Sequence, residues 1–146
     1  MNARHFFSKE EQEQIVAAIG AAENKTSGEI RVHMENRCKG EALDRAAELF
    51  AKLGMHKTAL RNGVLIYLAI EDHHFCILGD AGINAKVPDD FWEETTKHTI
   101  SLFKEEKFAE GMVYAITQCG EKLKADFPVA DDDVNELSDE ISFGDK

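Results

Sequence analysis

The stretch that decides the fold is residues 62–84, which read NGVLIYLAIEDHHFCILGDAGIN. Residues 64–70 are nearly all apolar, as is typical of a central strand that is covered on both faces. The polar residues 71–74 predict a tight turn, and residues 75–78 then return as an antiparallel strand. The stretch ends in a Gly-Asp-Ala-Gly loop at residues 79–82, where the glycines allow a strand end to present an oriented carboxylate.

The sequence before this stretch predicts a helix, a strand and a second helix. An S-x-x-E capping box at residues 8–11 begins a helix over Lys9–Glu23. Polar and apolar residues then alternate without a break over Glu29–Glu35, which indicates a half-buried strand with His33 on its solvent face. Apolar residues at helical spacing indicate a helix over Glu41–Leu53.

Two more helices are predicted after the stretch. Pro88, Asp89 and Asp90 suit the start of one, because proline fits the first helical position and carboxylates suit the helix dipole. The helical pattern breaks near Lys107 and restarts in a last helix that ends before Pro128. The helical crossover makes the first two strands parallel, and the third strand pairs antiparallel. We therefore predict an α/β fold, a three-layer α/β/α sandwich with a small mixed sheet of three to four strands.

The chain divides into a domain and an acidic segment. One domain is expected over residues 1–128, because a chain of 146 residues can bury a sizeable core. Residues 129–146 carry seven carboxylates and one lysine, which is typical of a mobile acidic C-terminal tail. Within this tail, Val134, Leu137 and Ile141 are spaced for a short helix that would dock weakly on the domain.

The composition excludes several classes of partner. A net charge of −11 argues against nucleic acid, because binding to phosphate backbones needs clustered Lys and Arg. The charge also disfavours anionic membranes, and no apolar run is long enough for membrane insertion. The first residues lack a signal peptide's apolar core, so a cytoplasmic location is expected. The three cysteines have no metal-binding spacing, and Cys38 is expected to be the most exposed thiol.

The predicted topology brings several polar residues to one edge of the sheet. Glu29 begins the first strand, Asn62 precedes the second, and Asp80 follows the third, which runs in the opposite direction. Asp89 and Asp90 open the next helix and can fold over the same edge. Crowded carboxylates repel unless a cation or protons compensate. Oxygen-only ligands favour Ca²⁺, with Mg²⁺ as the alternative because it demands a stricter octahedron.

Each of these residues also has an ordinary structural explanation. The two aspartates at positions 89–90 can cap the helix that follows them. Asp80 can form an Asx-type turn. Glu29 can pair at the surface with Arg61 or with Lys25. The sequence alone leaves the metal site and these alternatives about equally favoured.

Three segments resemble those of a known family. They are Thr26–Val32 (TSGEIRV), Arg61–Tyr67 (RNGVLIY) and Gly79–Asn84 (GDAGIN). With the weaker match at residues 108–112, they resemble the TPM-domain family over roughly residues 8–127, which is the size of a domain. The chain is similar to a cytosolic bacterial-type member, because it lacks the signal peptide and the transmembrane tail of many relatives.

The resemblance implies both a fold and a site. The family has an α/β/α sandwich fold, which agrees with the predicted topology. It includes a thylakoid-lumen acid phosphatase linked to photosystem II repair, membrane-tethered modulators and many bacterial proteins. Calcium binding at the sheet edge is a family property, and the matching positions here are Glu29 and Asp80. Asn62, Asp89 and Asp90 are added to that site from the topology.

Three functions therefore compete. The first is a Ca²⁺-binding domain with a structural or regulatory role. The second is a metal-assisted phosphomonoesterase, in which the ion activates water and Arg61 holds the phosphate ester. No P-loop or G-x-S-x-G motif is present, so catalytic residues stay unassigned. The third is a protein-binding module that contacts a protein partner through the acidic tail.

Overall fold

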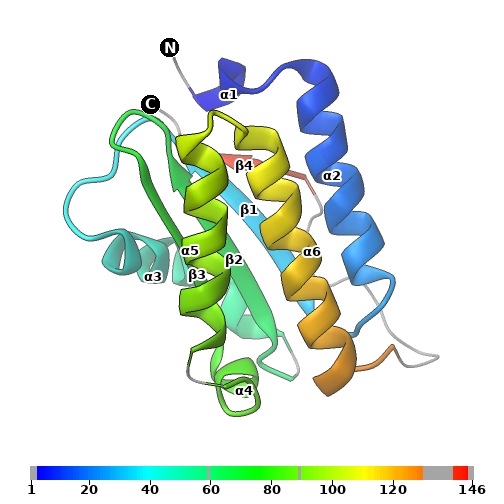
Figure 1. Ribbon diagram of the computed structural model, residues 1–146. Helices are drawn as coiled ribbons and strands as arrows, with labels where there is room; N and C mark the ends of the chain where they lie inside the picture. Colours follow the sequence, from blue (N-terminus) through cyan, green and yellow to red (C-terminus); the bar gives the residue numbers. More distant parts are fainter. Residues whose placement is uncertain (1–2, 59, 89, 130–139, 145–146) are drawn as a thin grey trace.

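A mixed sheet forms the centre of the protein (Figure 1). The computed structural model describes residues 3–58, 60–88, 90–129 and 140–144. Within these ranges the sheet contains β1 (Glu29–Glu35), β2 (Gly63–Ala69), β3 (His74–Gly79) and β4 (Ser142–Phe143), in the order β3-β2-β1-β4. β1 pairs in parallel with β2 and with β4, whereas β2 and β3 form an antiparallel hairpin.

Helices cover both faces of the sheet, which confirms the predicted three-layer sandwich (Figure 1). The helices on one face are α1 (Ala3–Phe6), α2 (Lys9–Glu23), α5 (Phe91–Lys104) and α6 (Phe108–Asp126). The opposite face carries α3 (Ala42–Lys52) and the short 3-10 helix η1 (Met55–Lys57). A single-turn helix, α4 (Ala81–Asn84), follows β3 at one end of the molecule.

The alternation of side chains along the strands divides the interior into two cores. Ile30, Val32 and Met34 of β1 belong to the larger core, beneath α2 and α6. Leu65 and Tyr67 of β2 belong to the smaller core, beneath α3. Every residue of β2 is buried, which confirms the prediction of a central strand covered on both faces.

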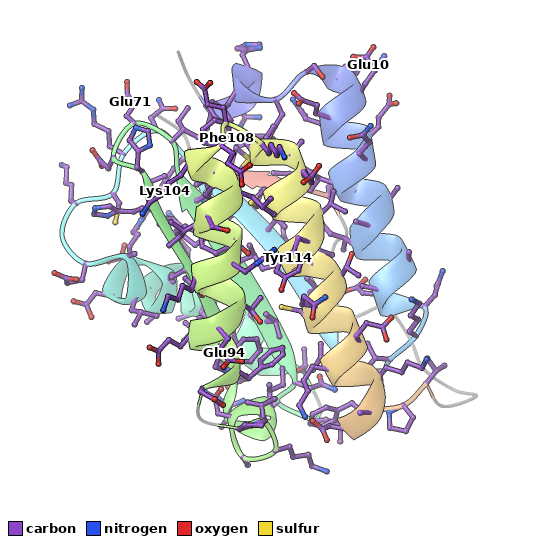
Figure 2. The ribbon with its side chains drawn as sticks, in the orientation of Figure 1. Glu10, Glu71, Glu94, Lys104, Phe108 and Tyr114 are labelled. Atoms are coloured by element: carbon purple, nitrogen blue, oxygen red, sulfur yellow. The ribbon has the colours of Figure 1, made fainter. Side chains whose placement is uncertain are left out.

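Aromatic rings close one end of the larger core, where α5 turns into α6. Phe108 begins α6, and Figure 2 shows its side chain at this turn. Its ring packs edge-on against Phe6 at 5.2 Å and stacks with Phe103 at 5.5 Å between ring centroids. These contacts attach the short helix α1 to the helical layer, an attachment that the sequence pattern does not reveal.

Two expectations about exposure are wrong. The alternation predicts a solvent face for His33, yet only 4% of the residue is exposed, because its ring stacks with Tyr67 and contacts Ser142 of the C-terminal strand. Cys38 was expected to be the most exposed thiol, but it is buried in the smaller core. The Cys38 Sγ lies 3.7 Å from the carbonyl oxygen of Gly40. This contact belongs to the polar turn after β1.

Two predicted boundaries shift. The Gly-Asp-Ala-Gly segment is expected as a loop, but Gly79 is the last residue of β3, Asp80 is the N-cap of α4, and the single turn of α4 begins at Ala81. The next helix starts at Phe91 rather than at Pro88, and the carbonyl of Pro88 accepts a hydrogen bond from the Phe91 amide in the preceding turn. Helix α6 ends at Asp126, before Pro128, as predicted.

The C-terminal segment contributes a strand. Ser142 and Phe143 pair with His33 and Met34 of β1, and the Gly144 amide donates to the Met34 carbonyl at 2.8 Å. Ile141 and Phe143 pack against the larger core, which gives this otherwise acidic segment an apolar anchor. The predicted short helix also involves residues 134 and 137, which lie outside the described residues.

Within the described ranges, no helix is both long enough and apolar enough to cross a bilayer. The longest of these helices, α6, has one buried face and carries charged residues on its other side.

Candidate functional site

The predicted site lies at the end of the sheet where β1 and β2 begin and β3 ends. Glu29 is paired with Gly63 across the parallel strands, and the Glu29 amide donates to the Asn62 carbonyl at 3.2 Å. The Asp80 amide donates to the Gly63 carbonyl at 2.9 Å. The backbone positions of Glu29, Asn62 and Asp80 therefore converge around Gly63. We call this group, together with Arg61, the Asp80 site.

The polar residues of the Asp80 site are unusually buried for their type. Glu29, Asn62 and Asp80 are each less than a tenth exposed. The Asn62 side-chain amide donates to the Ser27 carbonyl at 3.3 Å, which ties this residue to the turn before β1. Glu29 is the first residue of β1, Asn62 directly precedes β2, and Asp80 directly follows β3.

Arg61 holds the Asp80 carboxylate through both of its oxygens. Arg61 Nε donates to Oδ2 at 2.7 Å, and Nη2 donates to Oδ1 at 2.8 Å. The hydrogen bond with Asp80 raises the pKa of the Arg61 guanidinium. The Ala81 amide also donates to Oδ1 at 2.7 Å, in agreement with the structural alternative of a local turn at this residue.

The structure also shows where the two cations proposed as partners for Glu29 lie. Arg61 pairs with Asp80, and Lys25 pairs with Glu121 of α6 at 3.0 Å. The surface pairs expected from the sequence are therefore formed with other carboxylates.

The aspartates before α5 are not brought into the Asp80 site by any described contact. Asp89 lies outside the described residues. Asp90 is exposed at the cap position of α5, and its side chain makes no capping hydrogen bond. Among the described residues, no group of three or more His, Cys, Asp or Glu side chains is arranged to hold a metal ion. Any ion here would need ligands beyond the two buried carboxylates.

The backbone beside Arg61 is fixed by close contacts. Arg61 has a φ of 52°, in the left-handed region, and its carbonyl accepts the Gly82 amide at 2.9 Å. A Cβ atom at Gly82 would lie 2.7 Å from the Arg61 carbonyl oxygen, so only glycine fits this approach. The segment before β2 is therefore locked onto α4, while the Arg61 side chain remains about half exposed at 52%.

A second polar group lies at the other end of β1, and sequence reasoning missed it. Arg45 of α3 donates to both Glu35 oxygens at 2.8 Å, and the Tyr67 hydroxyl also donates to Glu35. His33 Nδ1 lies 2.9 Å from the Ser142 hydroxyl of β4. We call these five residues the Glu35 cluster. It joins α3, the two central strands and the C-terminal strand.

The electrostatics of the Glu35 cluster follow from burial. Burial lowers the pKa of His33 and outweighs the adjacent Glu35 carboxylate, whose Oε1 lies 3.5 Å from His33 Nε2. Burial acts to raise the pKa of Glu35, but hydrogen bonds from Arg45 and Tyr67 prevail and leave it below its ordinary value. Burial and the bond to Glu35 raise the pKa of Tyr67. The cluster is therefore a neutral histidine beside an ionised, fully hydrogen-bonded carboxylate.

A cavity of about 880 Å³ adjoins the Glu35 cluster. Its lining includes His33, Glu35 and Arg45, together with charged side chains of α3 and of the loop after β1. Its charges are mostly paired already: Arg45 with Glu35 and Glu48, and Arg37 with Glu71. Figure 2 shows Glu71 at this end of the molecule and Glu94 toward the other end, near α4. The sequence gives one signal for this cluster. Polar residues alternate along β1, and Tyr67 is the one tyrosine in the otherwise aliphatic strand β2.

The fold and the Asp80 site define the class of protein as a small α/β/α sandwich with buried carboxylates at one sheet end. The model of the TPM domain matches residues 1–122, and the chain belongs to the TPM-domain family. A search of curated proteins finds no match.

Solved structures agree with this assignment. BA42 protein from the psychrophilic bacterium Bizionia argentinensis is 46% identical, with a TM-score of 0.90 over 97% of this chain and 98% of that one. The N-terminal domain of a P. gingivalis protein is 18% identical, with a TM-score of 0.70 over 86% and 81% of the two chains. The N-terminal domain of cg2496 protein from Corynebacterium glutamicum is 13% identical, with a TM-score of 0.66 over 99% and 85%. The last two similarities concern the fold alone.

Proposed function

We propose that this protein is a divalent-cation-binding α/β domain with a structural or regulatory role, and that Ca²⁺ binds at the Asp80 site. The observation that carries the proposal is the convergence of Glu29, Asn62 and Asp80 around Gly63, with all three residues buried. A buried carboxylate needs a compensating positive charge, which Arg61 supplies to Asp80 in this structure. The oxygen-only donor set suits Ca²⁺ or Mg²⁺, and Ca²⁺ tolerates the irregular geometry better.

The residues present fit such an ion in part. Asp80 and Glu29 supply carboxylates, and Asn62 supplies a carboxamide beside them. Asp89 and Asp90 are the proposed additional ligands, which would have to approach from the segment before α5. The ion would also have to replace Arg61, which now holds the Asp80 carboxylate.

A metal-assisted phosphomonoesterase is the second candidate. The half-exposed Arg61 guanidinium beside a buried carboxylate favours it, because a forked guanidinium matches a phosphate group. The family's short name, TPM phosphatase, points the same way. An ion at Asp80 would neutralise phosphate charge, and Arg61 would orient the ester. Turnover of a generic phosphate ester that is lost in Asp80→Asn is the result this candidate requires.

A cytoplasmic location is also part of the proposal. The three cysteines are free and buried, which suits a reducing compartment. Fractionation of cells that produce the protein from its own gene tests the location.

The cation proposal is tested by titrating Ca²⁺ into the metal-stripped full chain and following amide NMR resonances, with Mg²⁺ in a parallel titration. Saturable shifts are expected at Glu29, Asn62 and residues 80–84. Asp80→Asn should weaken binding at least about tenfold, because the ion loses a charged ligand. Asp44→Asn, on the exposed surface of α3, is the matched control and should bind as the wild type does. Shifts confined to residues 129–146 would refute the site.

A further inference from the structure

The Glu35 cluster contains a serine, a histidine and a carboxylate in a row. Ser142 Oγ lies 2.9 Å from His33 Nδ1, and His33 Nε2 lies 3.5 Å from Glu35 Oε1. Ser142 is paired with His33 across β4 and β1, and Glu35 follows two residues later on the same face of β1. A hydroxyl within hydrogen-bond reach of a histidine, with a third group that orients the ring, is the arrangement of an activated serine nucleophile on unrelated folds.

The surroundings of His33 determine where its single ring proton lies. His33 Nε2 is buried and, within the described residues, has no hydrogen-bond partner. The ionised Glu35 carboxylate nearby attracts a proton to Nε2, which leaves Nδ1 to accept the proton of the Ser142 hydroxyl. Hydrogen bonds in catalytic groups are often long before substrate binds, so a separation of 3.5 Å on the carboxylate side fits this role.

The charges around His33 keep the ring able to act as a base. Burial lowers the pKa of His33, the Glu35 carboxylate raises it, and the guanidinium groups of Arg45 and Arg31 lower it further. The pKa therefore lies below its ordinary value, and the ring is neutral at pH 7. A neutral imidazole beside an ionised carboxylate is the resting state that proton abstraction from a serine requires.

The cavity beside the Glu35 cluster provides room for a substrate. The half-buried Ser142 lines this cavity, whose volume of about 880 Å³ is typical of small-molecule sites. It lies at the carboxyl ends of the parallel strands β1 and β4, where α/β sheets bind their ligands. Lys39 and Lys52 also line it, and in the part of the chain that the structure describes neither forms an ion pair. Their charges are available to stabilise a developing oxyanion.

We propose that Ser142 is the nucleophile of a carboxylic-ester hydrolase site, with His33 as its general base and Glu35 as the positioning residue. Ser142 Oγ forms a bond to the ester carbonyl carbon as its proton moves to His33 Nδ1. The ester C–O bond then breaks, and that proton passes to the departing alcohol. Water attacks the acyl–serine in the same way, which releases the acid and restores the serine hydroxyl.

The strength of the base favours esters over amides. Glu35 also accepts from Arg45 and from the Tyr67 hydroxyl, so less of its charge is left to stabilise a protonated His33. An alcohol is a better leaving group than an amine and needs less assistance from the protonated ring. Ser142 lies beyond residues 1–122, which match the TPM-domain model, so this site is separate from the family assignment.

Reaction of the full chain with a fluorophosphonate, followed by mass spectrometry of the protein and its peptides, tests the nucleophile. The serine oxygen should displace fluoride, so that one phosphonyl group stays on Ser142. Ser142→Ala should lose this label, and His33→Asn should form it at least about a hundredfold more slowly. Hydrolysis of p-nitrophenyl acetate should fall in both variants. Circular dichroism checks that each variant is folded.

Two matched controls exclude reactions at the surface. Ser101 is an exposed serine whose hydroxyl donates to the His98 carbonyl at 2.6 Å, and Ser101→Ala should react as the wild type does. His56 is an exposed histidine, and His56→Asn controls for ester hydrolysis by a surface imidazole. Neither residue belongs to the Glu35 cluster.

The role of Glu35 is tested through the pH dependence of labelling. Labelling requires neutral His33, so its rate should be complete above the ordinary histidine pKa of about 6.5 and should fall at lower pH. Glu35→Gln removes the carboxylate that raises the His33 pKa, so the midpoint should move to lower pH while the rate falls. Glu35→Asp keeps the charge and should restore the midpoint. A purely structural role would lower the rate without moving the midpoint.

The outcomes decide the proposal. A phosphonyl group on Ser142 whose formation depends on His33 supports it. Labelling at full rate in His33→Asn, a label confined to other residues, or ester hydrolysis that persists in Ser142→Ala would overturn it. Failure of the wild type to react with either reagent would also overturn it, and would leave the cation proposal unaffected because that site lies at the other end of β1.

Discussion

A buried carboxylate lies near each end of β1 and is paired with an arginine, but the two pairs differ in how far the arginine is exposed. In each pair the arginine donates hydrogen bonds to both carboxylate oxygens: Arg61 to Asp80, and Arg45 to Glu35. The Arg61 side chain is 52% exposed, whereas that of Arg45 is 27% exposed. Glu35 also accepts from the Tyr67 hydroxyl, while Asp80 accepts otherwise from the backbone amide of its own turn.

The difference indicates two roles for one pairing. In the Glu35 cluster the charge is enclosed by α3 and two strands, so breaking the pair leaves an uncompensated charge in the interior. In the Asp80 site the arginine is half exposed to solvent, and our proposal is that another cation takes its place. The Glu35 cluster therefore joins α3 to the strands, whereas the Asp80 site is the one for which we propose cation binding.

The largest expected effect is the loss of the Glu35 carboxylate. Glu35→Ala removes the acceptor for Arg45 and for Tyr67, and should lower the free energy of unfolding by about 3–5 kcal/mol. Urea denaturation followed by circular dichroism measures this loss. Glu48→Ala is the control, because Glu48 also pairs with Arg45 but is exposed, and its effect should stay within about 0.5 kcal/mol. Equal losses of unfolding free energy in both variants would show that the enclosure of Glu35 does not contribute to stability.

The next effect concerns the fixed backbone of the Asp80 site. Gly82→Ala places a Cβ atom against the Arg61 carbonyl, so the segment must shift, at a cost of about 1–3 kcal/mol. The same shift should move the amide resonance of Arg61 in NMR spectra. Ala81→Ser, at the exposed neighbouring position, should leave both stability and that resonance nearly unchanged. A Gly82→Ala protein of wild-type stability would mean that the segment before β2 is not locked.

The sequence predicts the fold well because its signals are local. The alternation over β1, the capping box at Ser8 and the apolar run of β2 each depend on neighbouring residues, and each element forms where it is expected. The predicted half-burial of β1 is wrong, because nearly all of its residues are buried. The strand β4 depends on a contact between residues about a hundred positions apart, so no local pattern reveals it. His33 was misplaced for the same reason, since its covering elements come from distant segments.

The candidate site is predictable only at the level of the backbone. Strand order and direction suffice to bring Glu29, Asn62 and Asp80 to one end of the sheet. The partner of each side chain depends on loop geometry, such as the left-handed conformation of Arg61, which sequence patterns do not specify. The Glu35 cluster was missed because polar residues that alternate along a strand usually face solvent.

A pH effect on stability is expected at the Glu35 end. Because burial lowers the pKa of His33, the unfolded chain binds this proton more readily than the folded protein does. Stability is therefore complete above the ordinary histidine pKa of about 6.5, and falls as the pH drops below it, by at most about 1.4 kcal/mol per pH unit. Glu35, whose pKa is lowered, adds a further loss at more acidic pH.

Unfolding midpoints in urea from pH 8 to pH 5 measure this effect. His33→Asn should flatten the profile between about pH 5 and pH 6.5. His56→Asn is the control, because His56 is exposed and should leave the profile as it is. If the profile of the His33 variant keeps its full slope, the proton is taken up elsewhere in the unfolded chain.

The smallest effect tests the comparison most directly. Arg61→Ala removes an exposed partner and should lower the free energy of unfolding by about 1 kcal/mol or less. Millimolar Ca²⁺ should restore that loss, because an ion bound only to the folded protein raises its stability by mass action. Arg45→Ala breaks the enclosed pair and leaves the Asp80 site intact, so Ca²⁺ should stabilise it only as much as it stabilises the wild type, and the difference in stability between these two proteins should stay the same. Thermal unfolding of the two variants, with and without Ca²⁺, measures both responses. If Ca²⁺ stabilises Arg45→Ala more than it stabilises the wild type, or does not stabilise Arg61→Ala, the two ends of β1 do not differ in the way their exposure indicates.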